Sequence, residues 1–228
     1  AGSITSSVSA NTDSGFSVVS YTSNASSSGT IGHGLGVAPS MIIVKLRGGT
    51  SSWAVYHKSL GATQYMFLNA SNASASSIAY WNNIEPTPTL FSVGNSTSTN
   101  NSPATTEIAY CFAEVKGFSK FGSYTGNGST DGTFIYTGFK PSWIMFKRSD
   151  GVQDWYMYDN KRNTYNPENL QLDAMDSAAE STLLSGDFLS NGFKFRSLSS
   201  AFNTSGGTFI YMAFAENPFV TSGGTPTT

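Results

Sequence analysis

Few side chains in this 228-residue sequence could catalyse a reaction, and those that could are scattered. The two histidines, His33 and His57, belong to no HExxH run and to no other zinc-ligand spacing. Cys111 is the only cysteine, so no disulfide can form within the chain and no cysteine-rich zinc site can close. The sequence predicts no metal site and no cofactor, and it leaves calcium binding by loop oxygens open.

Carboxylates are unevenly distributed along the chain. The first half has only Asp13, Glu85, Glu107 and Glu114, whereas the second half is richer in acids. Glycoside hydrolysis needs two carboxyl groups placed across a cleft, and nothing in the spacing fixes such a pair. We therefore expect no enzyme. Glu114 and Glu216 each follow a Phe-Ala pair, which favours a structural ion pair, with Lys45 and Lys147 as candidate partners.

Aromatic side chains give a better lead to function. Trp81 lies between Tyr80 and Asn82, so its indole could stack on a sugar ring while the amide binds hydroxyls. The alternative is a loop tryptophan folded back onto its own domain. Candidates in the second half combine rings with a planar guanidinium and suit a polar glycan: Tyr158, Asp159, Arg162 and Tyr165. We expect these two groups to form a carbohydrate-binding surface, with Trp81 as the leading contact.

Composition narrows the class of protein. Charged residues make up 11% of the chain, against about 25% in ordinary soluble proteins, while aromatic residues reach 14%. No apolar run approaches the roughly 20 residues that span a bilayer, so we expect no membrane insertion. The net charge is −2 and basic residues are scattered, which argues against nucleic acid as a partner. Such a chain is typical of extracellular or virion β-structure.

The elements that must position the candidate residues occur twice. Pro39, Trp53 and Glu114 recur as Pro141, Trp155 and Glu216 at a constant offset of 102 residues (141 − 39, 155 − 53 and 216 − 114). A period this long exceeds the roughly 20 to 50 residues of solenoid units, so each copy should close its own core. The two copies differ most at residues 61–104 and 160–192, where a binding surface should lie because loops vary freely on a fixed scaffold.

Short alternating segments separated by Gly, Pro, Ser and Asn predict an all-β fold of two tandem, homologous antiparallel β-sandwich repeats, jelly-roll-like in character. The expected organisation has four parts: a linker or connecting strand at 1–14, repeat 1 at 15–117, repeat 2 at 118–219 and a C-terminal tail at 220–228. One short helix is expected between Asn166 and Phe188, because Ser177 and Glu180 have the spacing of a capping box before Leu183 and Leu184.

Three runs carry a resemblance to a known family: GFSKFGSYTGNG at 117–128, YTGFKPSWIMFKR at 136–148 and AFAENPF at 213–219. They resemble a duplicated domain of bacteriophage tail and fibre proteins, over residues 15–219. The resemblance implies a virion component that contacts the host surface and other virion proteins, generally as a homotrimer. It implies no catalytic or ligand residues.

Three functions of different classes follow from these observations. The first is a tail-fibre module for host adhesion, which binds a host receptor or a cell-surface carbohydrate. The second is a purely structural virion part, such as a fibre spacer or a capsid decoration. The third is a polysaccharide depolymerase, which alone would need paired acids in a cleft.

Overall fold

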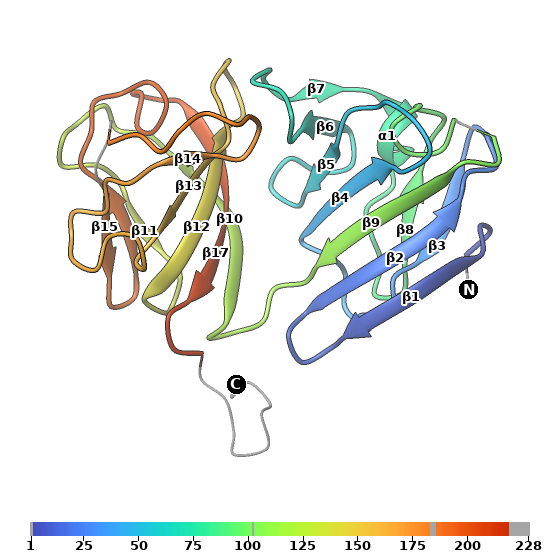
Figure 1. Ribbon diagram of the computed structural model, residues 1–228, viewed down its shortest axis with the longest axis horizontal. Coiled ribbons are helices and arrows are strands. Elements are labelled where there is room, and N and C mark those ends of the chain that lie inside the picture. The colour runs from blue at the N-terminus through green and yellow to red at the C-terminus, as the bar shows by residue number, and fades with distance from the viewer. Residues whose placement is uncertain (1, 102, 183–185, 219–228) are drawn as a thin grey trace. The chain divides into compact units, whose positions relative to one another are not determined.

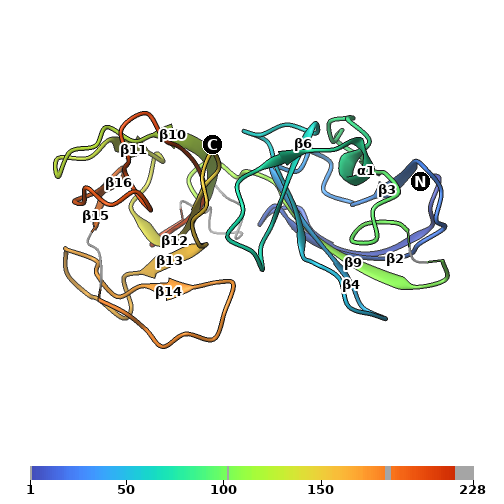
Figure 2. The same ribbon diagram turned by 90° about the horizontal axis from the view of Figure 1, so that it is seen from above.

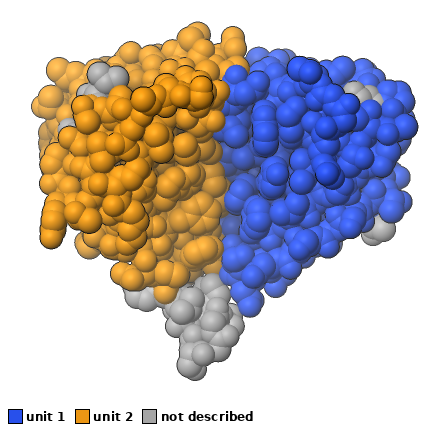
Figure 3. Space-filling view, viewed as in Figure 1, with its two compact units in different colours: residues 1–69, 74–114 blue, residues 70–73, 115–228 orange. Residues whose placement is uncertain are grey.

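The computed structural model describes residues 2–101, 103–182 and 186–218, and its elements are β-strands with one short helix (Figure 1). The all-β expectation is therefore confirmed. The chain forms two compact units: unit 1 contains residues 1–69 and 74–114, and unit 2 contains residues 70–73 and 115–228 (Figure 3). The C-terminal tail expected at 220–228 lies outside the described residues.

Unit 1 has a seven-stranded antiparallel sheet in the order β1-β2-β9-β4-β5-β6-β7. Its strands are β1 (Ser6–Asn11), β2 (Phe16–Thr22), β4 (Met41–Leu46), β5 (Ala54–His57), β6 (Gln64–Phe67), β7 (Ala75–Ser76) and β9 (Thr106–Phe112). A second sheet pairs β3 (Gly29–Gly32) with β8 (Leu90–Val93), and the helix α1 (Ile78–Trp81) precedes β8. Figure 2 shows β3 and α1 on one side of the sheet that contains β2, β4 and β9.

The core of unit 1 follows from strict alternation along its strands. In β2 the residues Val19 and Tyr21 are buried while Val18 and Ser20 are only partly buried, and β9 alternates in the same way. These inward side chains join Ile31 and Phe91 of the other sheet in one apolar cluster. Cys111 is in that cluster, where burial raises the pKa of its thiol to about 12 and leaves it unreactive at neutral pH.

Residues 1–14, expected to be a linker or connecting strand, contain β1. This strand pairs with β2 along its whole length, from Ser6 opposite Tyr21 to Asn11 opposite Phe16. It forms an edge of the sheet, and its side chains are nearly all exposed.

Unit 2 has a five-stranded antiparallel sheet in the order β10-β17-β12-β13-β14. Its strands are β10 (Ser119–Thr125), β12 (Pro141–Arg148), β13 (Tyr156–Asp159), β14 (Leu172–Asp173) and β17 (Thr208–Ala215). A three-stranded sheet has the order β11-β16-β15, with β11 (Phe134–Tyr136), β15 (Gly186–Leu189) and β16 (Gly192–Phe195). The core of this unit is rich in rings: Tyr124 stacks on Phe209 at 4.7 Å between centroids, and Phe146 packs on Phe195 at 4.6 Å.

The two units have matching internal contacts. The order β2-β9-β4-β5 in unit 1 has its counterpart in β10-β17-β12-β13 of unit 2. Tyr21 donates its hydroxyl hydrogen bond to Thr99 O at 2.7 Å, and Tyr124 donates to Phe202 O at 2.9 Å.

Each unit also has a buried asparagine that closes a loop. Asn100 Oδ1 accepts from the backbone of Asn24, and its Nδ2 donates to Asn24 Oδ1 at 3.0 Å. Asn203 makes the same two contacts with Asn127, at 2.9 and 2.8 Å. We call each arrangement an asparagine clamp, since it fixes the loop that follows β2 or β10.

The predicted helix between Asn166 and Phe188 is wrong for the described residues of that segment, which carry no helix. Gln171 and Ser181 form a β-bridge, and Asp176 accepts a hydrogen bond from the backbone of Ala178. This side-chain turn competes with the capping box, so the backbone satisfies its polar groups without a helix. Leu183 and Leu184 lie outside the described residues.

The ion pairs predicted for Glu114 and Glu216 exist, but with other partners. Glu114 pairs with Lys58 at 2.6 Å and Glu216 with Lys140 at 2.9 Å. Lys45 and Lys147 instead donate to backbone carbonyls, Lys45 to Ser51 O and Lys147 to Arg148 O.

Candidate functional site

The expectation that Trp81 is an exposed sugar platform is wrong. Its side chain is only 2% exposed, because α1 turns the indole into the core of unit 1. There it packs edge-to-face on Tyr56, with 5.9 Å between ring centroids. Trp81 is thus the tryptophan folded back onto its own domain, and among the described residues its Nε1 has no hydrogen-bond partner.

Tyr80 and Asn82 form no binding surface with it. Tyr80 is half-buried and stacks on Tyr65 at 3.6 Å. Asn82 ends α1 in the left-handed conformation, with φ 54°, and its backbone N–H donates to Ile78 O. Asn82 has a capping role because asparagine tolerates this conformation better than most residues.

In unit 2, Tyr158 is also a core residue rather than a ligand contact. Its ring is buried between Phe146 and Phe202, and its hydroxyl donates to Gln171 Oε1 at 3.1 Å. Tyr156 and Tyr158 lie on the same face of β13, and that face points to the core. The sequence did not show which of the two faces of this strand is covered.

The other three candidates lie at the end of β13 and in the loop that follows it. We call residues 159–168 the tyrosine loop. Arg162 is held between two carboxylates: its Nε donates to Asp159 Oδ2 at 2.6 Å, and its Nη1 donates to Glu180 Oε2 at 2.7 Å. Burial alone would raise the pKa of Asp159, but hydrogen bonds from Arg162 outweigh it and the pKa is lowered. The group therefore stays charged at neutral pH.

Among the large hydrophobic side chains of the described residues, Tyr165 is the most exposed, at 85%. The loop around it is anchored on both sides. Asn163 Nδ2 donates to Asn169 Oδ1 at 2.9 Å. Asn166 exchanges two hydrogen bonds with the backbone of Phe188, at 3.0 and 2.9 Å. An exposed ring on an anchored loop is a ready stacking surface.

The tyrosine loop also has polar atoms that the rest of the described structure does not satisfy. Four such buried atoms lie within it: Asn160 Oδ1, Arg162 Nη2, Asn163 Oδ1 and Glu168 Oε2. Buried polar atoms normally have partners, so these four lack a hydrogen bond that such atoms usually make. Burial, followed by the nearby Asp159, raises the pKa of Glu168 to about 7.

A second surface was missed by the sequence reasoning. The outer side of the β11-β16-β15 sheet exposes Phe134 and Tyr136, while Ile135 between them is buried. Lys194 lies opposite Phe134, and Asp187 lies opposite Lys194. We call these four outward residues the β11 face. The signal was present in the sequence, because alternation around a buried Ile135 requires both rings to point outward.

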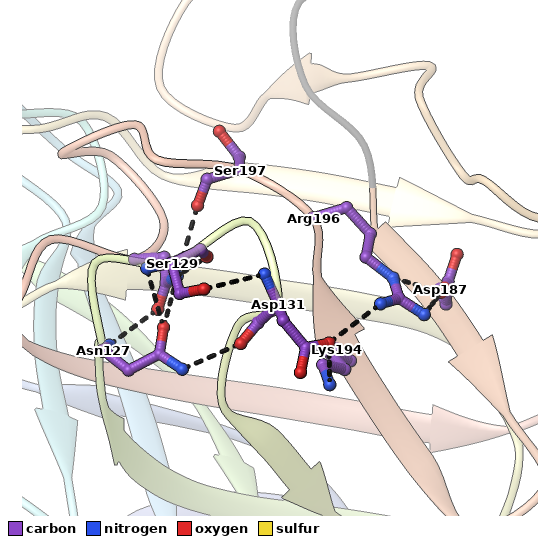
Figure 4. A network of polar contacts seen from close by, with 8 residues as sticks. Asn127, Ser129, Asp131, Asp187, Lys194, Arg196 and Ser197 are labelled. Carbon is purple, nitrogen blue, oxygen red and sulfur yellow. Dashed lines mark hydrogen bonds and ion pairs between the residues drawn. The ribbon is translucent and has the colours of Figure 1, made fainter.

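Charges on and beside the β11 face balance one another. Figure 4 shows Asp131 between Lys194 and Arg196, at 2.6 and 3.1 Å, and Arg196 also pairs with Asp187. The hydrogen bond from Lys194 is the main reason that the pKa of Asp131 is lowered. The loop that carries Asp131 is held by the asparagine clamp of unit 2, through Ser129 and Asn203.

A family model for a domain of unknown function, DUF7483, matches residues 1–218. The chain belongs to this family. No curated protein matches the sequence, and no solved structure matches it. The family match spans both units, so the pair of units is what the family model describes.

The chemistry open to this DUF7483 domain follows from what its described residues bring together. No three His, Cys, Asp or Glu side chains in the described ranges gather as a metal site would require. His33 is buried and its Nε2 lies 3.1 Å from Thr87 O, while His57 Nδ1 accepts from the backbone of Ser59. Nor does any helix in those ranges have the length and hydropathy to cross a membrane.

Proposed function

We propose that the protein is a non-enzymatic carbohydrate-binding module of bacteriophage tail-fibre type, which attaches a virion to a host-surface glycan or receptor. The observation that supports it is the tyrosine loop, where the exposed ring of Tyr165 follows the carboxylate-held guanidinium of Arg162. Aromatic rings stack on sugar faces, and fixed guanidinium and carboxylate groups bind hydroxyls. The three runs that resemble phage fibre proteins support the proposal that the protein is part of a virion.

Rigidity in this loop favours binding over catalysis. Arg162 is fixed by Asp159 and Glu180 before any ligand arrives, so little side-chain entropy is lost on binding. Glu168, the acid whose pKa is raised to about 7, is buried and 3% exposed, so it does not present an acid to a polysaccharide chain. A depolymerase is therefore disfavoured.

We also propose that units 1 and 2 are tandem homologous antiparallel β-sandwich repeats. The constant offset of 102 residues, the matching strand orders and the paired asparagine clamps support this. Independent origin would not place a tyrosine and an asparagine at matching points of both units.

The proposed assembly is a homotrimer that contacts other virion proteins. Strand β1 presents a sheet edge with neither lysine nor proline in Ser6–Asn11, and such an edge is poorly protected against pairing with another chain. A purely structural virion part is the second candidate. The burial of Trp81 favours it, since unit 1 loses its leading ligand contact.

A glycan array probed with the intact protein tests the proposed function. We expect one or a few glycans to be bound, with Tyr165→Ser abolishing that binding. Leu198→Ser is the matched control, because Leu198 is another exposed apolar side chain of unit 2 outside the tyrosine loop. Failure to bind any array glycan or host-cell surface would support the structural alternative, and release of oligosaccharides would support a depolymerase.

A further inference from the structure

We infer that unit 2 has a further saccharide subsite, a pocket beside Tyr136 that takes one neutral pyranose unit. It is lined by Gly138, Phe139, Lys140, Ser190, Glu216 and Asn217, and we call it the Lys140 pocket. The inference rests on the proposed glycan-binding function but concerns different residues from those of the tyrosine loop. The two places are joined by Asn160, whose Nδ2 donates to Glu216 Oε1 at 2.8 Å.

The size of the pocket limits its ligand. Its volume is about 270 Å³, just below the roughly 300 to 1,000 Å³ of drug-sized ligand sites. There is room for one sugar ring with its hydroxyls, but not for a longer segment. A glycan would therefore insert a single residue here.

Hydrogen bonds to backbone carbonyls hold the walls of the Lys140 pocket in place. Gly138 has φ 84°, a left-handed conformation that favours glycine, and its N–H donates to Asn191 O at 3.2 Å. Thr137 Oγ1 donates to Phe139 O at 2.6 Å, and the Glu216 N–H donates to Lys140 O at 2.9 Å. The segments after β11 and after β17 are thus tied together, so the pocket does not depend on a ligand to hold its shape.

The polar groups of the pocket suit hydroxyls rather than a charged ligand. Lys140 Nζ and Glu216 Oε2 pair at 2.9 Å, and this hydrogen bond from Lys140 is the main reason that the pKa of Glu216 is lowered. Both groups are partly exposed and carry opposite charges, so the pocket is neutral as a whole. A sugar hydroxyl can accept from the ammonium and donate to the carboxylate, whereas an acidic sugar would meet Glu216.

Tyr136 provides the stacking surface beside the pocket. Its side chain is 62% exposed, and a Cβ built on Gly138 would lie 3.6 Å from its Oη, so the ring reaches a lining residue. Opposite Tyr136 on β16 lies Gly192, which has no side chain to cover the ring. A ring beside a small hydroxyl-binding pocket is the chemistry that recognises a pyranose.

The β11 face helps to choose between possible occupants. A second copy of this chain or another protein would gain from an unbalanced charge or a broad apolar patch at this place. Instead, Lys194 and Arg196 are already neutralised by Asp131 and Asp187. Two exposed rings, Phe134 and Tyr136, with balanced charges beside them match a neutral ligand that has both an apolar face and hydroxyls.

The experiment is an NMR titration of the intact protein with four probes: methyl glucoside, methyl galactoside, N-acetylglucosamine and glucuronate. Because a single sugar should bind weakly, in about the millimolar range of Kd, amide shifts are the appropriate signal. We expect at least one neutral probe to shift the amides of Gly138, Lys140, Ser190 and Asn217 in a saturable way, and glucuronate to bind more weakly.

Three variants make the test specific. Tyr136→Ser should weaken binding of the neutral probe by tenfold or more, Tyr136→Phe should retain it, and Leu198→Ser should leave it unchanged. Each side chain is largely exposed, so all three variants should fold. The inference is overturned if no neutral probe shifts the pocket amides, if glucuronate binds there best, or if Tyr136→Ser binds like the parent. Loss of glycan-array binding in Tyr165→Ser together with unshifted pocket amides would uphold the proposed function and reject the subsite alone.

Discussion

Units 1 and 2 share a strand order but place their polar side chains differently. Opposite Tyr21 on β9, unit 1 has Glu107, fully buried with no hydrogen-bond partner among the described residues. Opposite Tyr124 on β17, unit 2 has Phe209, which stacks on that tyrosine. The corresponding positions thus hold an unsatisfied acid in unit 1 and an aromatic side chain in unit 2.

The loops of the two units also differ in where they place aromatic side chains. Between β5 and β8, unit 1 uses Trp81 to complete its core, and the indole is inaccessible to solvent. The segment after β13 in unit 2 instead exposes Tyr165 and holds Arg162 between two carboxylates. Loop aromatics therefore pack into the core in unit 1 and reach the surface in unit 2.

The largest expected effect comes from the two buried tryptophans. Trp81→Ala and Trp155→Ala should each lower the free energy of unfolding by about 3 to 5 kcal/mol, because each leaves a large cavity. Urea unfolding monitored by circular dichroism measures the loss. A loss below about 1 kcal/mol for Trp81→Ala would mean that this indole is not part of the core of unit 1.

Glu107 should make the stability of unit 1 depend on pH. Burial raises the pKa of Glu107 to about 7 from its ordinary value of 4.5, and Lys45 offsets only part of this. The neutral acid is favoured in the folded state, so unit 1 is most stable below pH 4.5. As pH rises from 4.5 to above 7, unit 1 should progressively lose about 3 kcal/mol of stability.

Unfolding of the parent at pH 5 and pH 8 measures this difference. Glu107→Met should remove the dependence and stabilise unit 1 at pH 8, while Glu107→Gln should remove it without adding apolar contacts. Equal stability of the parent at both values would show that Glu107 is solvated or paired in solution.

The asparagine clamps should show an intermediate effect. Asn100→Ala and Asn203→Ala each leave loop groups without partners, at a cost of about 2 kcal/mol. Asn203→Ala should cost more, because Asn203 Nδ2 also donates to Ser197 O at 3.2 Å. Thermal unfolding of the two variants measures both losses of stability. A larger loss in Asn100→Ala than in Asn203→Ala would contradict this expectation.

The smallest expected effect concerns the ion pairs of Glu114 and Glu216. The pairs with Lys58 and Lys140 are partly exposed, so each should contribute about 0 to 1 kcal/mol and weaken with added salt. A double-mutant cycle on Lys58 and Glu114, compared with one on Lys140 and Glu216, measures both. Coupling above about 2 kcal/mol in either cycle would show that the pair is desolvated.

The sequence was informative for features that follow from the alternation of side chains along strands and from the constant offset between the two halves. Alternating segments between Gly, Pro, Ser and Asn predicted an all-β fold, and the described elements are strands with one short helix. It failed where a short local turn reverses a side chain. Nothing in Ala79-Tyr80-Trp81 announces the single helical turn that buries the indole, and nothing in Tyr156-Met157-Tyr158 tells which face is covered.

The candidate site was recovered only in part for the same reason. Asp159 and Arg162 could be joined from their spacing, because an acid and a guanidinium three residues apart meet readily in a tight loop. The partner Glu180 could not be foreseen, since it is brought close by the Gln171–Ser181 bridge. The Lys140 pocket combines residues from three distant segments, and no local pattern predicts it.

Amide hydrogen exchange of the intact protein, with and without a glycan that it binds on the array, tests whether unit 2 holds the glycan site. We expect protection only in unit 2, at residues 159–168 and 136–140, with no change at residues 61–69 and 74–104 of unit 1. Protection centred on residues 77–83 around Trp81, with the tyrosine loop unchanged, would contradict it.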